Sequence, residues 1–255
     1  MGWITRNVPA PVVNAARRVL LAVTRQPQLG SVRYGELRRT RPISRHFGCD
    51  RGGAVDRYYI ERFLDRHRAD VRGRVLEIGE DTYTLRYGGE RVERCDILHV
   101  SESNRKATIV ADLADAPHIP DDAFDCVILT QTLQLIFRPD LALATVHRAL
   151  KPGGVLLLTV PGITQVATES EWGPSWYWSF TERSVRRLLE DAFGDGRVET
   201  LVHGNVLAAA TQLYGLGVVE LTPEELADTD PDYQVIITAR AIKFGPEHDQ
   251  GGHRA

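Results

Sequence analysis

Residues 148–161 read Arg-Ala-Leu-Lys-Pro-Gly-Gly-Val-Leu-Leu-Leu-Thr-Val-Pro, and residues 119–129 read Ile-Pro-Asp-Asp-Ala-Phe-Asp-Cys-Val-Ile-Leu. Each segment contains a short apolar strand, at Val155–Val160 and at Phe124–Leu129. Between these strands, Pro139 to Leu150 has apolar residues at helical spacing, with proline in the first turn. A strand, a helix and a second strand in this order predict a parallel βαβ unit with buried strands.

Apolar segments on both sides extend this unit into a larger sheet. The alternation of short strands with helices predicts an α/β fold: a Rossmann-like, doubly wound, mostly parallel seven-stranded sheet with helices on both faces, plus an N-terminal helical extension. The further helices are expected at Ala54–Asp70 and at Thr181–Phe193, with Thr181 as N-cap. The further strands are expected at Arg74–Gly79, Asp96–Val100, Ala107–Val110, Val198–His203 and Tyr233–Ala241.

Composition divides the chain into three parts. Residues 1–46 form a basic arm with a helix at Pro11–Thr24, which reads as a solvated extension and also offers a surface for a homodimer. Residues 47–244 form the domain, and an insertion at 204–231 precedes its last strand. Residues 245–255, with their Gly, His and charged residues, predict a disordered tail.

The totals exclude several classes of protein. The chain has 255 residues, 43% of them apolar and 25% charged, as in an ordinary soluble domain, and the net charge of −3 argues against a nucleic-acid partner. The apolar run Val19–Val23 is too short to span a membrane and has no cleavage site after it, so a cytoplasmic location is expected. Three widely spaced cysteines predict neither disulfides nor a zinc site, and no metal constellation is visible.

The stretch from Asp112 to Pro161 resembles the second half of the class I S-adenosylmethionine (SAM) dependent methyltransferase domain, and the resemblance extends over residues 42–241. It implies SAM as cofactor and a small-molecule substrate. Residues 42–59 and the altered glycine loop are similar to those of a bacterial subgroup often encoded near glycosyl-transfer or secondary-metabolite genes. That resemblance implies methylation of an oxygen in a sugar, glycoside or other secondary metabolite.

The resemblance also implies which residues hold the cofactor. Glu77, Gly79 and Asp81 follow the first strand, although Asp81 and Tyr83 stand where further glycines are usual. SAM carries a cationic sulfonium and an amino group, so acids nearby are tolerable. After the third strand, Asp112-Leu113 matches the position that meets the adenine amino group. Glu102, one position beyond the expected ribose acid, either reaches the ribose or is an exposed surface glutamate.

Upstream of the first domain helix, the sequence is dense in Arg, Asp, Tyr and Gly. Arg51 or Arg57 is expected to pair with the methionine carboxylate of SAM, and Tyr58 to cover it. The alternative is an Asp-Arg network that only pins the N-terminal arm. Gln131, after the fourth strand, falls at the junction of cofactor and substrate sites and is a candidate for contacting either.

The loop after the fifth strand is rich in aromatic residues, which suggests a wall of the substrate pocket. Trp172, Trp176 and Tyr177 are the predicted substrate contacts. Methyl transfer needs a base only for a poorly acidic hydroxyl, and His203 and His46 are the candidates, with Gln131 as a further catalytic candidate.

Two other functions stay open. One is a non-methylating protein that retains the fold as a regulatory or SAM-binding partner, which the departures at Asp81, Tyr83 and Ser101 favour. A nucleic-acid methyltransferase would use the basic arm, but the sequence lacks the Asn/Asp-Pro-Pro-Tyr motif of amino-group methylation.

Overall fold

The computed structural model describes residues 26–168, 170, 172–194 and 197–245. The helix expected at Pro11–Thr24, with the homodimer surface it offered, and all but the first residue of the expected tail lie outside the described residues. The compact unit that carries the sheet begins at Pro42, where the sequence predicted residue 47. Residues before 47 join this unit through long-range backbone bonds, in which the N–H groups of Ile43 and Ser44 donate to Tyr214 O at 2.8 and 3.2 Å.

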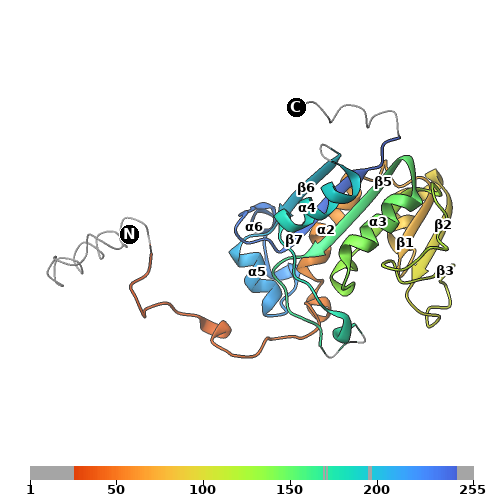
Figure 1. Cartoon of the computed structure of the whole chain (residues 1–255). Helices are drawn as coiled ribbons and strands as arrows, with labels where there is room; N and C mark the ends of the chain where they lie inside the picture. The colour runs from red at the N-terminus through yellow and green to blue at the C-terminus, as the bar shows by residue number, and fades with distance from the viewer. Residues whose placement is uncertain (1–25, 169, 171, 195–196, 246–255) are drawn as a thin grey trace, which may run out of the picture. The chain divides into compact units, whose positions relative to one another are not determined.

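The sheet has seven strands in the order β3-β2-β1-β4-β5-β7-β6 (Figure 1). Strand β7 runs antiparallel to both β5 and β6, and the other pairs are parallel. This confirms the predicted mostly parallel, doubly wound sheet, and the strand order reverses between β1 and β4. The strands are β1 Gly73–Ile78, β2 Val92–His99, β3 Ile109–Val110, β4 Phe124–Thr130, β5 Leu150–Pro161, β6 Val198–His203 and β7 Ile236–Ile242.

Helices cover both faces of the sheet. Helices α3 and α4 pack on one face, and α2, α5 and α6 pack on the other (Figure 1). Helix α4 begins with a capping box, in which Thr181 Oγ1 accepts from Ser184 N, as its predicted N-cap requires. The helices are α2 Val55–Arg66, α3 Pro139–Ala149, α4 Glu182–Phe193, α5 Val206–Leu213 and α6 Pro223–Ala227.

The core follows from the alternation of side chains along each buried strand. In β4, Val127 and Leu129 pack under α3 and α4, whereas Cys126 and Ile128 pack under α2 and α5. All four side chains are fully buried, and burial of each aliphatic one contributes about 1.5–3 kcal/mol. Strand β2 begins at Val92, four positions before the predicted Asp96, because its first half is polar and partly exposed and gives no apolar signal.

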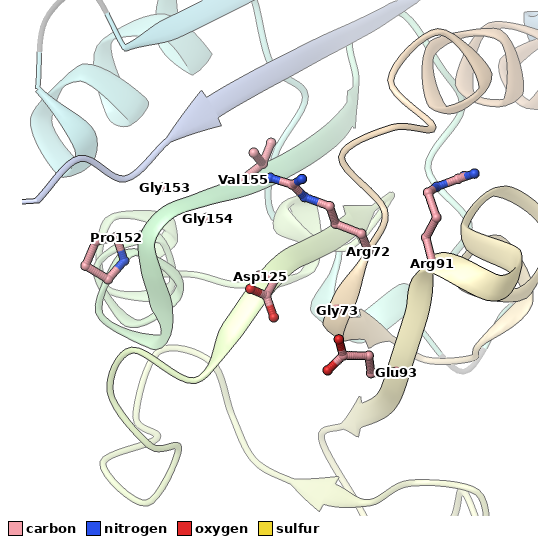
Figure 2. A pocket seen from close by; sticks show the side chains of 9 residues that line it. All are labelled: Arg72, Gly73, Arg91, Glu93, Asp125, Pro152, Gly153, Gly154 and Val155. Atoms are coloured by element: carbon pink, nitrogen blue, oxygen red, sulfur yellow. The ribbon is translucent and has the colours of Figure 1, made fainter.

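The two edges of the sheet differ. At the amino edge, Asp125 Oδ2 accepts from Arg74 N at 2.8 Å and from Lys151 Nζ at 2.7 Å. Gly73 is required there, because a Cβ atom would lie 2.4 Å from that oxygen. A hollow of about 600 Å³ lies beside Gly73 and Asp125, and Figure 2 shows the residues that line it. The predicted site residues that follow strands β1 to β5 lie at the opposite, carboxyl edge, where ligands of such sheets bind.

Candidate active site

The loop after β1 is held by a buried carboxylate. Glu77 accepts hydrogen bonds from Tyr83 N at 3.1 Å and from Thr84 N at 2.7 Å. Burial raises the pKa of Glu77, and these backbone donors act against that rise. Glu77 therefore orders the loop that follows Gly79, and its oxygens are engaged by that loop.

The residues that replace the usual glycines leave space at the end of β1. Gly79 has φ +89°, and a Cβ atom built on it would meet nothing within 4 Å. Tyr83 turns into the core, where its ring stacks on Tyr87 with centroids 6.1 Å apart. Asp81 is half-buried, with Lys106 Nζ 3.7 Å from its carboxylate. The altered loop thus leaves the backbone at Gly79 open to close approach.

The ends of β2 and β3 present two acids. Glu102 is exposed in the turn after β2, consistent with either role predicted for it. Asp112 is also exposed, and its Oδ1 accepts from Ala114 N at 2.9 Å, while no hydrogen bond to Oδ2 occurs within the described residues. The side chain of Leu113 is in the core, 3% exposed, so this residue offers a ligand only its backbone.

Four uncharged residues gather where β4 and β5 end, and we call Gln131, Gln134, Thr159 and Trp176 the glutamine cluster. Gln131 N donates to Thr159 O at 2.9 Å, and Gln134 Nε2 donates to Gln131 O at 2.8 Å. Gln131 has φ +48°, which is unfavourable for a residue with a side chain and is typical of functional sites.

The glutamine cluster holds buried polar atoms without partners. Each of its four side chains contributes one such atom: Gln131 Nε2, Gln134 Oε1, Thr159 Oγ1 and Trp176 Nε1 have no hydrogen bond among the described residues. An unpaired buried polar group costs about 1–3 kcal/mol, so four of them in one place mark a candidate site.

The aromatic loop, residues 162–180, extends across the carboxyl edge. Trp176 stacks on Phe47, with ring centroids 6.4 Å apart and planes at 8°. Trp172 lies edge-on to His99 at the end of β2, with centroids 5.8 Å apart. Trp172, expected to face substrate, therefore lies on the side of the site where β2 presents its ribose candidates. Tyr177 is half exposed and packs edge-on to Phe137.

Arg51, before α2, and Arg57, in α2, both have protein partners. Arg51 pairs with Glu220 at 2.7 Å, and Arg57 Nη1 donates to the Tyr83 hydroxyl at 2.9 Å. Tyr58 lines a groove beside α2, and the Arg62 guanidinium carbon lies over the Tyr58 ring, 5.3 Å from the ring centroid. These contacts favour the pinning network over the predicted grip on the methionine carboxylate. The cofactor roles of Arg51, Arg57 and Tyr58 stay predictions.

The two predicted bases differ in environment. His203 ends β6, and its Nε2 is 3.0 Å from Thr238 Oγ1. Burial and the nearby Arg66 lower its pKa to about 4, which makes it a weak base near neutral pH. His46 is exposed and directly precedes Phe47, which stacks on Trp176. Both histidines are one residue removed from the glutamine cluster: His46 through Phe47, and His203 through Thr238, the cross-strand neighbour of Thr159.

Sequence reasoning missed three contributors. Asn104 Nδ2 donates to Gly79 O at 2.5 Å and braces the end of β1. Gln134 and Thr159 belong to the glutamine cluster, and Thr159 had a visible signal. It is a polar residue in an apolar strand, two positions before the strand ends. Within the described residues, no group of three or more potential ligands could hold a metal ion, and no helix has the length and hydropathy to cross a bilayer.

The residues present at the carboxyl edge fit SAM. The open space at Gly79 lets a ligand contact the backbone there. Gln131 Nε2 has no hydrogen-bond acceptor among the described residues. Asp81, Glu102 and Asp112 carry the charge that suits a sulfonium, an amino group, ribose hydroxyls and an adenine amino group.

Comparisons with known proteins agree with a SAM site at the carboxyl edge of the sheet. Residues 74–158 match the family described as Methyltransferase domain. A Mycolicibacterium smegmatis protein named as a probable S-adenosylmethionine-dependent methyltransferase is 27% identical over 180 residues, covering 69% of this chain and 65% of that protein. The ubiquinone/menaquinone biosynthesis C-methyltransferase UbiE of Methylococcus capsulatus is 35% identical over 95 residues, covering 37% and 36%. The chain therefore spans less than two thirds of either relative.

Among solved structures, a SAM-dependent methyltransferase from Archaeoglobus fulgidus aligns with 73% of this chain and 94% of its own, at 16% identity and a TM-score of 0.49.

Proposed function

We propose that this chain, which belongs to the class I SAM-dependent methyltransferase superfamily, transfers a methyl group to an oxygen atom of a small molecule such as a sugar, a glycoside or another secondary metabolite. The observation that carries the proposal is the glutamine cluster. Its unpartnered polar atoms are all uncharged and include both donors and acceptors, which suits a neutral acceptor rich in hydroxyl groups.

SAM, when bound, supplies an electrophilic methyl group. We expect Asp112, Glu102 and Asp81 to hold its polar ends, and the open space at Gly79 supports this. The protein's further task is to position the acceptor oxygen, because methyl transfer is an in-line displacement in which orientation supplies much of the rate. Gln131 and Thr159 orient acceptor hydroxyls, while Trp176 and Phe47 give a flat apolar wall.

A proton must leave when an O–H group becomes O–CH₃. No member of the glutamine cluster titrates in the useful range, so it offers no base. His46 is the proposed acceptor of that proton when the hydroxyl is weakly acidic. A phenolic or enolic hydroxyl would ionise without its help.

The decisive experiment uses SAM labelled with ¹³C in its methyl group, incubated with neutral glycosides, phenols and quinols. We expect the label in an O–CH₃ group, identified by its NMR shift. Labelled C–CH₃ would instead establish carbon methylation, the second candidate. That candidate is supported by the printed activity of the UbiE relatives, which are C-methyltransferases.

The non-methylating alternative is tested by calorimetric titration with SAM and, separately, S-adenosylhomocysteine. We expect a dissociation constant on the order of micromolar for at least one of them. Binding without turnover across the acceptor panel would favour a SAM-binding partner. The inward turn of Tyr83 and the open space at Gly79 support the binding competence that both functions need.

A further inference from the structure

A groove of about 800 Å³ runs beside helix α2 and reaches strand β6. It lies on the α2 face of the sheet, none of the glutamine cluster lines it, and we call it the α2 groove. Tyr59 of α2 and His203 of β6 form its floor, with ring centroids 5.5 Å apart. Its walls include Tyr58, Arg62 and Arg66 of α2.

The α2 groove carries an excess of positive charge. Its two carboxylates are already neutralised, Glu61 by Arg86 at 2.9 Å and Asp65 by Arg68 at 3.6 Å. Arg62 and Arg66 have no carboxylate partner within the described part of the chain. Two guanidinium groups that face a shared hollow without counter-charge attract an anion and can bind it with charge-assisted hydrogen bonds.

The floor adds flat rings and a free donor. Tyr59 is 3% exposed, and its hydroxyl has no hydrogen-bond partner among the described residues. Burial raises the pKa of Tyr59 to about 12, so the hydroxyl keeps its proton and can donate it. His203 is neutral near pH 7, since burial and Arg66 lower its pKa to about 4. Both rings are therefore uncharged near pH 7, and the α2 groove keeps its net positive charge.

We propose that the α2 groove binds a small organic anion: a carboxylate or phosphate group carried on a planar ring. Arg62 and Arg66 pair with the anionic group, and the rings of Tyr58, Tyr59 and His203 contact the planar part. The Tyr59 hydroxyl gains the partner it lacks. The groove shares no lining residue with the glutamine cluster, and its binding of an anion does not depend on the proposed function.

The test titrates the full chain at low salt with phenyl phosphate and with benzoate, followed by calorimetry. Inorganic phosphate and benzyl alcohol, which supply the charge alone and the ring alone, are the comparison ligands. We expect at least one ring-bearing anion to bind more tightly than either comparison ligand, and its binding to weaken as salt is added. The preference between phenyl phosphate and benzoate identifies the anionic group.

Variants locate the binding. Arg62→Gln and Arg66→Gln should each raise the dissociation constant of the ring-bearing anion roughly tenfold, because each removes a charge-assisted hydrogen bond. Tyr59→Phe keeps the ring and the fold, and it should raise the dissociation constant of the anion by a smaller factor. Arg187→Gln on α4, on the opposite face of the sheet, should change nothing, and SAM affinity should stay constant in all four variants.

Absence of binding by both ring-bearing anions would overturn the proposal. So would equal affinity for inorganic phosphate, or unchanged affinity in both arginine variants. None of these results bears on SAM binding or methylation, which are measured separately.

Discussion

At the scale of single residues, Asp112 shows how a site residue differs from a structural one. Its Oδ1 caps the turn by accepting from Ala114 N, and its other oxygen stays available in an exposed carboxylate. Asp125 is the contrast. Burial alone would raise its pKa, but hydrogen bonds from Lys151 and Arg74 N outweigh burial and hold the pKa below its usual range. The fold already uses Asp125 fully, whereas Asp112 has capacity for a ligand.

Asp112→Asn should raise the dissociation constant of SAM about tenfold, because an N–H₂ group replaces an oxygen that would accept from the adenine amino group. The Asn side chain can still cap Ala114, so the turn is kept. Calorimetry of the variant with SAM and S-adenosylhomocysteine measures the effect. Asp115→Asn, three positions on, is the matched control. An unchanged affinity in Asp112→Asn would remove Asp112 from the cofactor site.

His46→Ala should lower kcat roughly 100-fold with an aliphatic hydroxyl acceptor and much less with a phenol, because only the former needs a base. SAM affinity should not change. The measurement is the pH profile of kcat for both acceptors. His118→Ala, an exposed histidine 3.2 Å from Val110 O, serves as control. Equal losses with both acceptors would show that His46 acts otherwise than as a base.

At the scale of elements, the aromatic loop joins parts of the edge that strands keep apart. Trp172 contacts His99 at the end of β2, while Trp176 contacts Phe47 from the N-terminal segment. The loop is anchored where it leaves β5, since a Cβ atom on Gly162 would lie 2.1 Å from Gln234 O. The two tryptophans therefore serve different ends of the site.

Trp172→Ala should lower the affinity for SAM several-fold and leave the acceptor KM unchanged. Trp176→Ala should raise the acceptor KM and leave SAM affinity unchanged. Loss of an aromatic contact worth about 0.5–1.5 kcal/mol corresponds to a change of roughly 2- to 12-fold. Steady-state kinetics with both substrates varied separates the effects. If both variants change the same constant, the loop acts as one wall.

The contact between β6 and α2 makes stability depend on pH through His203. Its pKa is lowered to about 4 in the folded chain, against about 6.5 when unfolded, so the unfolded chain takes up the proton first as the pH falls. The contribution of neutral His203 to the free energy of unfolding is fully present above its pKa in the unfolded chain, and it declines as the pH drops toward 4.

We therefore expect the free energy of unfolding to fall by roughly 1–2 kcal/mol between pH 7 and pH 5 because of His203. His203→Gln should remove that part of the pH dependence, and His118→Gln should not. Urea unfolding at both pH values is the measurement. Parallel curves for the parent chain and His203→Gln would contradict the assignment.

At the scale of the whole molecule, one ion pair ties the last strand to the first. Arg240 of β7 donates from Nε and Nη2 to the two oxygens of Asp70, at 2.8 and 3.0 Å, just before β1. Both side chains are about four-fifths buried, so the pair is protected from solvent screening. It connects residues far apart in the sequence, as a doubly wound sheet requires.

A double-mutant cycle with Arg240→Ala and Asp70→Ala should give a coupling energy of at least about 1 kcal/mol. The same cycle on Arg187 and Asp191, an exposed pair on α4, should give about 0.5 kcal/mol or less. Denaturant unfolding of the single and double variants measures both. A coupling no larger at Arg240–Asp70 would mean that burial adds nothing to this pair.

Much of the architecture was predictable because buried strands and amphipathic helices carry periodic apolar patterns. The apolar runs at β4 and β5 and the helix between them are local signals, and Thr181 was predicted correctly as an N-cap for the same reason. The polar first half of β2 lacks such a pattern, and the sequence accordingly placed its start too late. Segment 42–46 belongs to the domain through hydrogen bonds with distant residues, such as the backbone bonds to Tyr214, and these have no sequence signature.

The sequence by itself determined the sheet, the order in which strands and helices alternate, and the loops that carry the site, because periodicity and turn residues act over short distances. Only the tertiary structure decided which side chains are free to meet a ligand. It directs Tyr83 inward, engages Arg51 and Arg57 with Glu220 and Tyr83, and gathers the glutamine cluster. The physical reason is that hydrogen bonds and ion pairs between distant segments depend on three-dimensional proximity, which no local pattern encodes.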